Sequence, residues 1–414
     1  MAAFSLLERL GRRPAGAWCR TALARGTGLQ EVVETIGRQL GRCGPADLAL
    51  VFASASFASD LPRLLPLLQQ RLRAEHWLGC LGGGVVGTGS DAIPHELEQE
   101  PALSVTLLHL PGAHVHPFVL DGTNLPDLDG PADPWQLQVG AAGGSFHSML
   151  LLVDPTCQAI NDLINGLDYA YPDAVKVGGL AASHSAPHGS LLFGSEVRQG
   201  AVGCLLSGAW GLDAVVAQGC KPIGPILEVE QAQRNVVLQV SEGQRRSSPV
   251  AALQAILSGL SPEEREQVRH SLFLGVGQSS FSLERSDAEP AFLVRNLIGV
   301  DPRNGAVAVG ERMRVGQQVQ FQLRDGPSSQ AELCQLLDAQ AGRQSEPLAA
   351  LLFACLGRGE GLHGHADGDV TPCRERFDQV PIAGAFCQGE IGPVAGSTHL
   401  HGYTASWGFV VPRS

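Results

Sequence analysis

The chain has 414 residues, 44% hydrophobic and 17% charged, with a formal net charge of −12. This length predicts two or three domains, and the composition excludes a disordered chain. No apolar run approaches the roughly 20 residues of a membrane-spanning helix. Because Glu8 and Arg9 interrupt the apolar stretch near the start, the pattern also argues against a signal peptide, and we expect a cytoplasmic protein.

The first part of the chain alternates between helical and strand patterns. Thr27 can cap a helix whose apolar face is Leu29, Val32, Val33, Ile36 and Leu40, and an apolar run predicts a buried strand over 48–54. Ser59 and Pro62 open a second helix. A strand that ends in a Gly-rich loop follows, and a further strand is predicted over 103–110. We expect residues 1–46 to form an N-terminal helical segment.

The middle of the chain begins with a surface loop over 122–134, rich in Pro, Gly and Asp. A strand over 147–154 and a helix that stops at Pro172 come next. Several strand-like runs between 190 and 240 are separated by Gly, Asp or Pro, which is typical of a meander. No fixed-period repeat is visible.

The best boundary lies within 241–270, a polar stretch followed by two helices with Pro249 and Pro262 near their starts. A helix over 329–340, an apolar run over 348–357 and short strands complete the chain. These patterns predict an α/β fold of two interlocked halves, with mixed β-sheets flanked by helices.

Charge and cysteine patterns limit the function. Residues 74–175 contain no Lys or Arg and carry −13, so the remainder carries +1. This segment argues against nucleic-acid binding and is either a solvated surface or an attractant for a basic partner or a cation. The ten cysteines form no C-x-x-C pair, which predicts reduced, buried residues.

Three motifs in the C-terminal third carry the strongest functional signal. They are LLFACLGRG (351–359), VPIAGAFCQGEIGPV (380–394) and HLHGYTAS (399–406), each an apolar run that delivers polar residues into a Gly-rich turn. Glycine lets backbone N–H groups approach a ligand. Arg358 can bind a carboxylate or phosphate, and Glu390 can bind an amine or pair with Arg358.

These three motifs resemble the signature of the FIST C-terminal domain. Upstream, GGLAASHS (178–185), AVGCLLSG (201–208) and AQGCKPIGP (217–225) resemble the FIST N-terminal domain. The resemblance covers roughly residues 47 to 411. It implies an N-terminal domain over 47–245 and a C-terminal domain over 246–414, after the segment 1–46.

The resemblance implies a family that senses small ligands in bacterial signalling and recognises protein partners in eukaryotes. Amino acids are the expected ligands, because Arg358 and Glu390 offer both charges. We expect a ligand-binding role, with no cofactor and no metal, for nine motif residues: Cys355, Gly357, Arg358, Gly359, Gly389, Glu390, Gly392, His401 and Thr404.

Several alternatives stay open. Arg358 and Glu390 can form a structural pair that holds two loops together. The chain can be a scaffold that binds a protein partner through 74–175, and Cys355 can serve a thiol hydrolase or transferase. We favour a protein that is not an enzyme, and slightly favour a dimer. A zinc site of nearby His and Cys residues lacks the usual spacing, and the Gly-rich loop at 82–89 lacks the helix of a dinucleotide site.

Overall fold

The computed structural model describes residues 14–144, 146–278, 291–343 and 345–413, and expectations for residues 1–13 lie outside them. The chain divides into two compact units. Unit 1 comprises residues 1–217, 333–393 and 398–414, and unit 2 comprises 218–332 and 394–397. Unit 2 is therefore inserted in the sequence of unit 1.

Three six-stranded sheets form the described part of unit 1. The first has the order β1-β6-β2-β3-β10-β11, and in it only β2 and β3 run parallel. Its strands are β1 (Trp18–Arg25), β2 (Ala46–Ser54), β3 (Ala74–Gly82), β6 (Ala102–His109), β10 (Leu191–Phe193) and β11 (Glu196–Arg198).

The second sheet has the order β7-β12-β8-β9-β24-β25, and the third the order β13-β26-β22-β23-β4-β5. Each has one parallel pair at its centre, β8 with β9 and β22 with β23. The strands of the second are β7 (Ala113–Leu120), β8 (Ser148–Val153), β9 (Val175–Leu180), β12 (Ala201–Gly208), β24 (Gly389–Val394) and β25 (Ser397–His401). Those of the third are β4 (Val85–Thr88), β5 (Pro94–Leu97), β13 (Trp210–Ala217), β22 (Ala349–Cys355), β23 (Ile382–Cys387) and β26 (Ala405–Pro412).

The three sheets repeat one topology. Each sheet takes four strands in chain order from one stretch of unit 1, and its other two strands form a hairpin supplied by another stretch. In every stretch, the hairpin that is given to another sheet lies between the third and the fourth of these strands. Hairpin β4–β5 joins the third sheet, β10–β11 the first, and β24–β25 the second. Unit 1 is thus a cyclic threefold arrangement, and β24–β25 and β4–β5 interlock the N-terminal and C-terminal halves of the chain.

A glycine at the same register in each parallel pair supports this equivalence. Gly79 lies opposite Val51, Gly178 opposite Leu151 and Gly384 opposite Leu352. A Cβ at these glycines would lie 1.9, 1.7 and 1.8 Å from the facing carbonyl oxygens. Glycine is therefore required for the close approach of the two strands.

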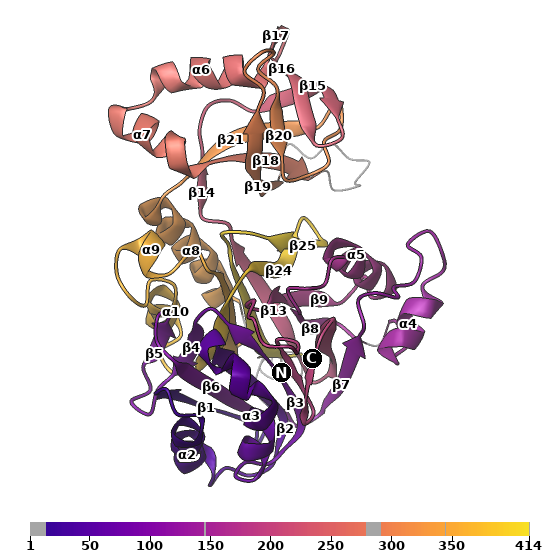
Figure 1. Ribbon diagram of the computed structural model, residues 1–414, viewed down its shortest axis with the longest axis vertical. Coiled ribbons are helices and arrows are strands. Elements are labelled where there is room, and N and C mark those ends of the chain that lie inside the picture. The colour runs from indigo at the N-terminus through magenta and orange to yellow at the C-terminus, as the bar shows by residue number, and fades with distance from the viewer. Residues whose placement is uncertain (1–13, 145, 279–290, 344, 414) are drawn as a thin grey trace, which may run out of the picture. The chain divides into compact units, whose positions relative to one another are not determined.

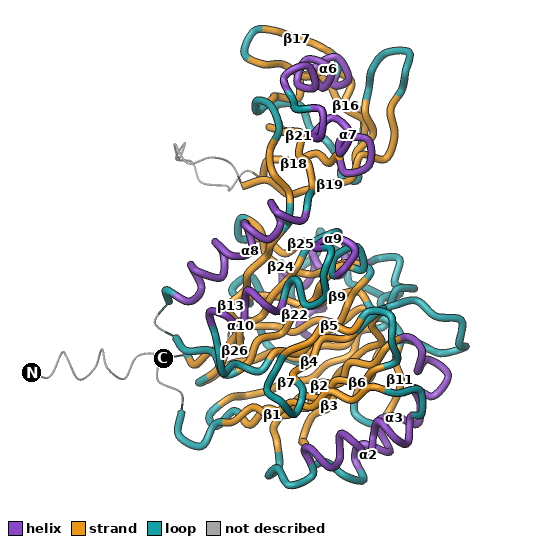
Figure 2. The backbone as a smooth tube through the Cα atoms, turned by 90° about the vertical axis from the view of Figure 1, so that its left-hand side faces the viewer, coloured by secondary structure: helices purple, strands orange, loops and turns teal. Residues whose placement is uncertain are grey.

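Alternating residues of the strands form one inner core and three outer ones. Phe52, Leu152 and Phe353, one from each sheet, belong to the same buried cluster. The opposite faces pack against helices, and Figure 1 shows these helices on three sides of the strands. They are α2 (Leu29–Leu40) and α3 (Leu61–Gln69), α4 (Asp133–Val139) and α5 (Ile160–Ala170), and α8 (Gly326–Ala341) and α10 (Val370–Arg376). Figure 2 shows α2 and α3 outside the strands of the first sheet.

The strands of unit 2 close into an antiparallel ring in the order β21-β15-β16-β20-β19-β18, with β18 returning to β21. Helices α6 (Pro249–Gly259) and α7 (Pro262–Ser271) follow the hairpin β16–β17. The strands are β14 (Cys220–Pro222), β15 (Leu227–Gln233), β16 (Val236–Glu242), β17 (Arg245–Ser247), β18 (Leu272–Gln278), β19 (Ala291–Val300), β20 (Val307–Val309) and β21 (Gln318–Arg324).

The predicted α/β fold with mixed sheets is confirmed. Three details differ from the sequence predictions. The meander over 190–240 is wrong, because β10, β12 and β13 lie in three different sheets. The segment predicted to be helical contains the strand β1 as well as α2. A repeat exists in topology although no sequence period shows it. No helix among the described residues is long and apolar enough to cross a membrane.

Candidate functional site

The three C-terminal motifs meet at the carboxyl ends of β22 and β23. The backbone N–H of Cys355 donates to the Thr404 carbonyl at 3.0 Å, and that of Leu356 donates to the Cys387 carbonyl at 3.0 Å. The N–H of Thr404 donates to the Glu390 carboxylate at 3.1 Å. Ligands of α/β sheets commonly bind outside the carboxyl ends of parallel strands, so this end of the third sheet is the candidate site.

The threefold arrangement distinguishes Cys355 from its counterparts. The glycine register places Ser54, Asp154 and Cys355 at the same position at the carboxyl end of the second strand of each repeat. The Ser54 hydroxyl donates to the Ala102 carbonyl at 3.0 Å and accepts from its N–H at 2.8 Å. The Asp154 carboxylate accepts from the Ser190 N–H at 2.7 Å. In two repeats the side chain at this position binds backbone, and in the third it is the buried thiol of Cys355.

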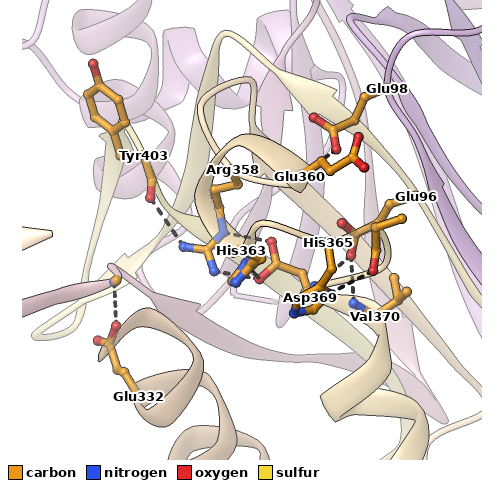
Figure 3. Close-up of polar contacts among 12 residues, drawn as sticks. Glu96, Glu98, Glu332, Arg358, Glu360, His363, His365, Asp369, Val370 and Tyr403 are labelled. Atoms are coloured by element: carbon orange, nitrogen blue, oxygen red, sulfur yellow. Dashed lines mark hydrogen bonds and ion pairs between the residues drawn. The ribbon is translucent and has the colours of Figure 1, made fainter. Parts of the chain in front are cut away.

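Arg358 is buried and bonded to Asp369. The guanidinium donates from Nε to Oδ2 at 2.7 Å and from Nη2 to Oδ1 at 2.5 Å, and Nη1 reaches the Tyr403 carbonyl at 3.4 Å. Figure 3 shows the two side chains facing each other, with His363 beside them. The Nε2 atom of His363 lies 3.2 Å from Asp369. Arg358 therefore ties the first motif to the start of α10 and to the third motif.

Glu96 joins this network from hairpin β4–β5. Its Oε1 accepts from the N–H groups of Asp369 at 2.8 Å and Val370 at 2.7 Å, as Figure 3 shows. Its Oε2 has no hydrogen-bond partner among the described residues. A segment of the first repeat therefore supports the loop that carries Arg358.

The two carboxyl groups have opposite pKa shifts. Burial, and then the Asp369 carboxylate, raise the pKa of Glu96 well above its usual range. Burial also opposes ionisation of Asp369, but the charge and hydrogen bonds of Arg358 outweigh it and hold the pKa of Asp369 well below its usual range. Of the two carboxyl groups, Glu96 is therefore the one that holds a proton more readily, and Asp369 the one that ionises more readily.

Gly359 is required by the backbone between these side chains. Its φ of +60° and ψ of −144° are rarely adopted by other residues. A Cβ there would lie 2.0 Å from the Glu98 carboxylate. Glu98 accepts from the Glu360 N–H at 2.8 Å, so the second glycine of the Gly–Arg–Gly sequence lets the loop dock on hairpin β4–β5.

Most of the nine predicted ligand-binding residues are buried. Exposed fractions are 0% for Glu390, 1% for Arg358 and Thr404, 3% for His401 and 8% for Cys355. The His401 ring contacts the Gly392 carbonyl through Nε2 at 3.0 Å, and Gly359 and Gly389 are buried. Gly357 is exposed. The polar side chains of the motifs thus form hydrogen bonds to the backbone in the interior, whereas parts of the turns that they stabilise lie at the surface.

Sequence reasoning missed Asp369, Glu96 and His363 as members of the network. Asp369 lies eleven residues after Arg358 (369 against 358), close enough that an acidic residue before a helix could have been considered. Glu96 comes from more than 250 residues away and carries no local signal. The predicted Arg358–Glu390 pair stays a prediction beside the observed Arg358–Asp369 pair.

Comparisons with known proteins agree with the motifs. The family model for the FIST N domain matches residues 47–242, and that for the FIST C domain matches residues 250–393. An uncharacterized protein of Mycobacterium tuberculosis is 34% identical over 89% of this chain and 92% of its own length. An uncharacterized protein of Mycobacterium bovis is 32% identical over 95% of this chain and 97% of its own.

Proposed function

Because this chain belongs to the FIST family, we propose that it is a cytoplasmic small-ligand sensor that binds its ligand where the three C-terminal motifs meet. One observation carries the proposal. Segments 355–359, 389–392 and 401–404 converge at the carboxyl ends of β22 and β23, with buried polar side chains fixing their turns. Such preorganised turns present backbone N–H groups at low conformational cost on binding.

Arg358 and Glu390 act in this proposal as positioning residues. Arg358 is neutralised by Asp369, so an incoming anion would have to displace a buried carboxylate. Glu390 fixes the N–H of Thr404. Ligand contacts then come from the exposed backbone at Gly357, the half-buried backbone at Gly402 and the edge of the buried Cys355 side chain. Amino acids remain the first compounds to test.

The test begins with native mass spectrometry of gently purified protein, followed by denaturation and identification of any released small molecule. The twenty amino acids are screened in parallel by thermal shift, because a ligand of the folded state raises the unfolding temperature. A bound compound or a saturable shift supports the proposal. Absence of both, at millimolar amino acid, contradicts the amino-acid assignment.

A pair of glycine variants locates the site. A Cβ at Gly402 or at Gly361 meets no heavy atom within 4 Å, so a larger side chain is accommodated at both positions. Gly402→Phe covers the turn of the third motif and should abolish ligand retention. Gly361→Phe, in α9 (Glu360–His363), is the matched control and should retain it. Equal retention by both variants would place the ligand elsewhere.

The partner-binding alternative loses part of its basis, because several acids of segment 74–175 are used within unit 1. Glu96 and Glu98 hold the Arg358 loop, and Asp154 fastens β8. Asp168 binds the buried Lys176 at 2.8 Å and the Thr398 backbone at 2.6 Å. The negative charge is thus partly internal, and a scaffold role for this segment stays a prediction.

A further inference from the structure

Unit 2 contains a cavity that the motif residues do not touch. It has a volume of about 390 Å³ and lies between helix α6 and strands β15 to β17. This volume falls within the range of about 300–1,000 Å³ that is typical of small-molecule sites. All its lining residues belong to unit 2.

The walls of the cavity are largely apolar. Leu227, Ile256 and Leu260 line it together with the small residues Ala251 and Ala255. Ala251 and Ala255 are four residues apart on one face of α6, and their short side chains leave the space open. Gly224, with φ of +72°, brings the chain against Ile256, where a Cβ would lie 2.5 Å from its side chain. The walls therefore suit an apolar ligand body.

Polar groups collect on one side of this cavity. Arg245 and Glu242 face each other across the hairpin β16–β17 and both line the cavity, as does Ser247. Neither charged side chain forms an ion pair with another described residue. The neighbouring Arg246, by contrast, is bound to Glu230 at 2.9 Å. Arg245 is consequently available to a ligand.

The balance of charge favours a single negative charge on the ligand. Ser247 and Ala251 flank the N-terminus of α6, whose Ser248 cap accepts from the Ala251 N–H at 3.2 Å. The first N–H groups of α6 are already bonded, that of Val250 to the Gly305 carbonyl and that of Ala251 to the Ser248 hydroxyl. The anionic group is therefore left to Arg245, which can bind a carboxylate through two hydrogen bonds. Glu242 opposes a dianion such as a phosphate monoester.

We propose that this cavity binds a monocarboxylic acid with an apolar body, as a second ligand site independent of the motif site. The apolar walls bind the hydrocarbon, and Arg245 binds the carboxylate. Octanoate is a suitable probe because it carries one carboxylate and a flexible apolar chain.

Calorimetric titration of the full-length protein with octanoate tests the proposal. Saturable binding is expected, with Arg245→Ala about tenfold weaker, which corresponds to about 1.4 kcal/mol of binding free energy. Arg246→Ala is the matched control and should bind as the wild type. Glu242→Gln should bind more tightly, because it removes the opposing charge.

Two further arms make the result decisive. Ala255 is exposed, so Ala255→Phe fills the cavity without entering the core, and it should abolish binding while circular dichroism stays unchanged. Octylamine and 1-octanol should bind less tightly than octanoate. The proposal is overturned if octanoate shows no saturable binding, if Ala255→Phe binds normally, or if 1-octanol binds as tightly. Gly402→Phe should leave octanoate binding intact, which separates this site from the motif site.

Discussion

The guanidinium of Arg358 and the carboxylate of Asp369 form a two-point ion pair in which both side chains have no solvent exposure. Removing water from two charges is costly, and only close geometry compensates for it. The pair thus fixes the loop after β22, but neither residue can be replaced without leaving a buried charge unpaired. Each member is far more sensitive to substitution than a surface residue.

Asp369→Asn should therefore lower the free energy of unfolding by about 3–5 kcal/mol, because it leaves the buried guanidinium without its counter-charge. Urea denaturation measures this. Asp338→Asn is the matched control, since Asp338 pairs with Arg376 at 2.7 Å with a side chain that is 63% exposed, and it should unfold close to the wild type. Equal losses of unfolding free energy in the two variants would show that the buried Arg358–Asp369 pair contributes no more to stability than the exposed Asp338–Arg376 pair.

Glu96 should make stability fall as pH rises. Its pKa is raised in the folded protein, so the folded state binds the proton more tightly than the unfolded state, whose Glu has a pKa near 4.5. Its contribution is complete below that value and is lost as pH increases toward the folded pKa. Glu96→Gln keeps an oxygen for the N–H groups of Asp369 and Val370 and should stabilise the protein more at pH 8 than at pH 5.

The contribution of Asp369 to stability changes with pH in the opposite direction. Its depressed pKa gives a contribution that is present above the unfolded pKa of about 3.9 and is lost as pH falls below it. Urea unfolding of the wild type, Glu96→Gln and Asp369→Asn between pH 3 and 8 separates the two carboxyl groups. An advantage of Glu96→Gln that is the same at every pH would refute the raised pKa of Glu96.

Gly384→Ala should destabilise the centre of the third sheet, because its Cβ would lie 1.8 Å from the Leu352 carbonyl. Overpacking of a tight core costs about 1–3 kcal/mol or more. Gly178→Ala should behave alike through the Leu151 carbonyl. Gly361→Ala, which meets no atom within 4 Å, is the control. Thermal unfolding of the three variants measures the difference, and a normal transition for Gly384→Ala would contradict the strand register.

Thiol labelling of the folded protein tests the thiol-enzyme alternative. Burial raises the pKa of Cys80 and of Cys204 to about 12, which suppresses their thiolates. The half-buried residues Cys43, Cys157, Cys220 and Cys334 should react with iodoacetamide first, and the buried Cys355 should react late. Mass spectrometry of a time course identifies the labelled positions. Preferential labelling of Cys355 would support a nucleophilic role for it.

Several helices and turns could be predicted from the sequence, because they are determined by residues that are close together in the chain. The predicted apolar face from Leu29 to Leu40 is the buried face of α2, although the N-cap is Gly28 and not Thr27. Pro249 and Pro262 begin α6 and α7, as predicted. The motifs around Cys355, Glu390 and Thr404 were also recognisable, since each is a strand that ends in a glycine-containing turn.

The family, the α/β class and the segments that form the candidate site could all be predicted from the sequence, because hydrophobic periodicity and turn chemistry act within a few residues. The contacts between residues that lie far apart in the sequence became visible only in the folded structure. The cyclic exchange of hairpins places Glu96 under the loop of Arg358, and Asp369 neutralises its charge. Such contacts depend on which strands pair, and strand pairing is set by the closure of three sheets around one shared core, which no local pattern encodes.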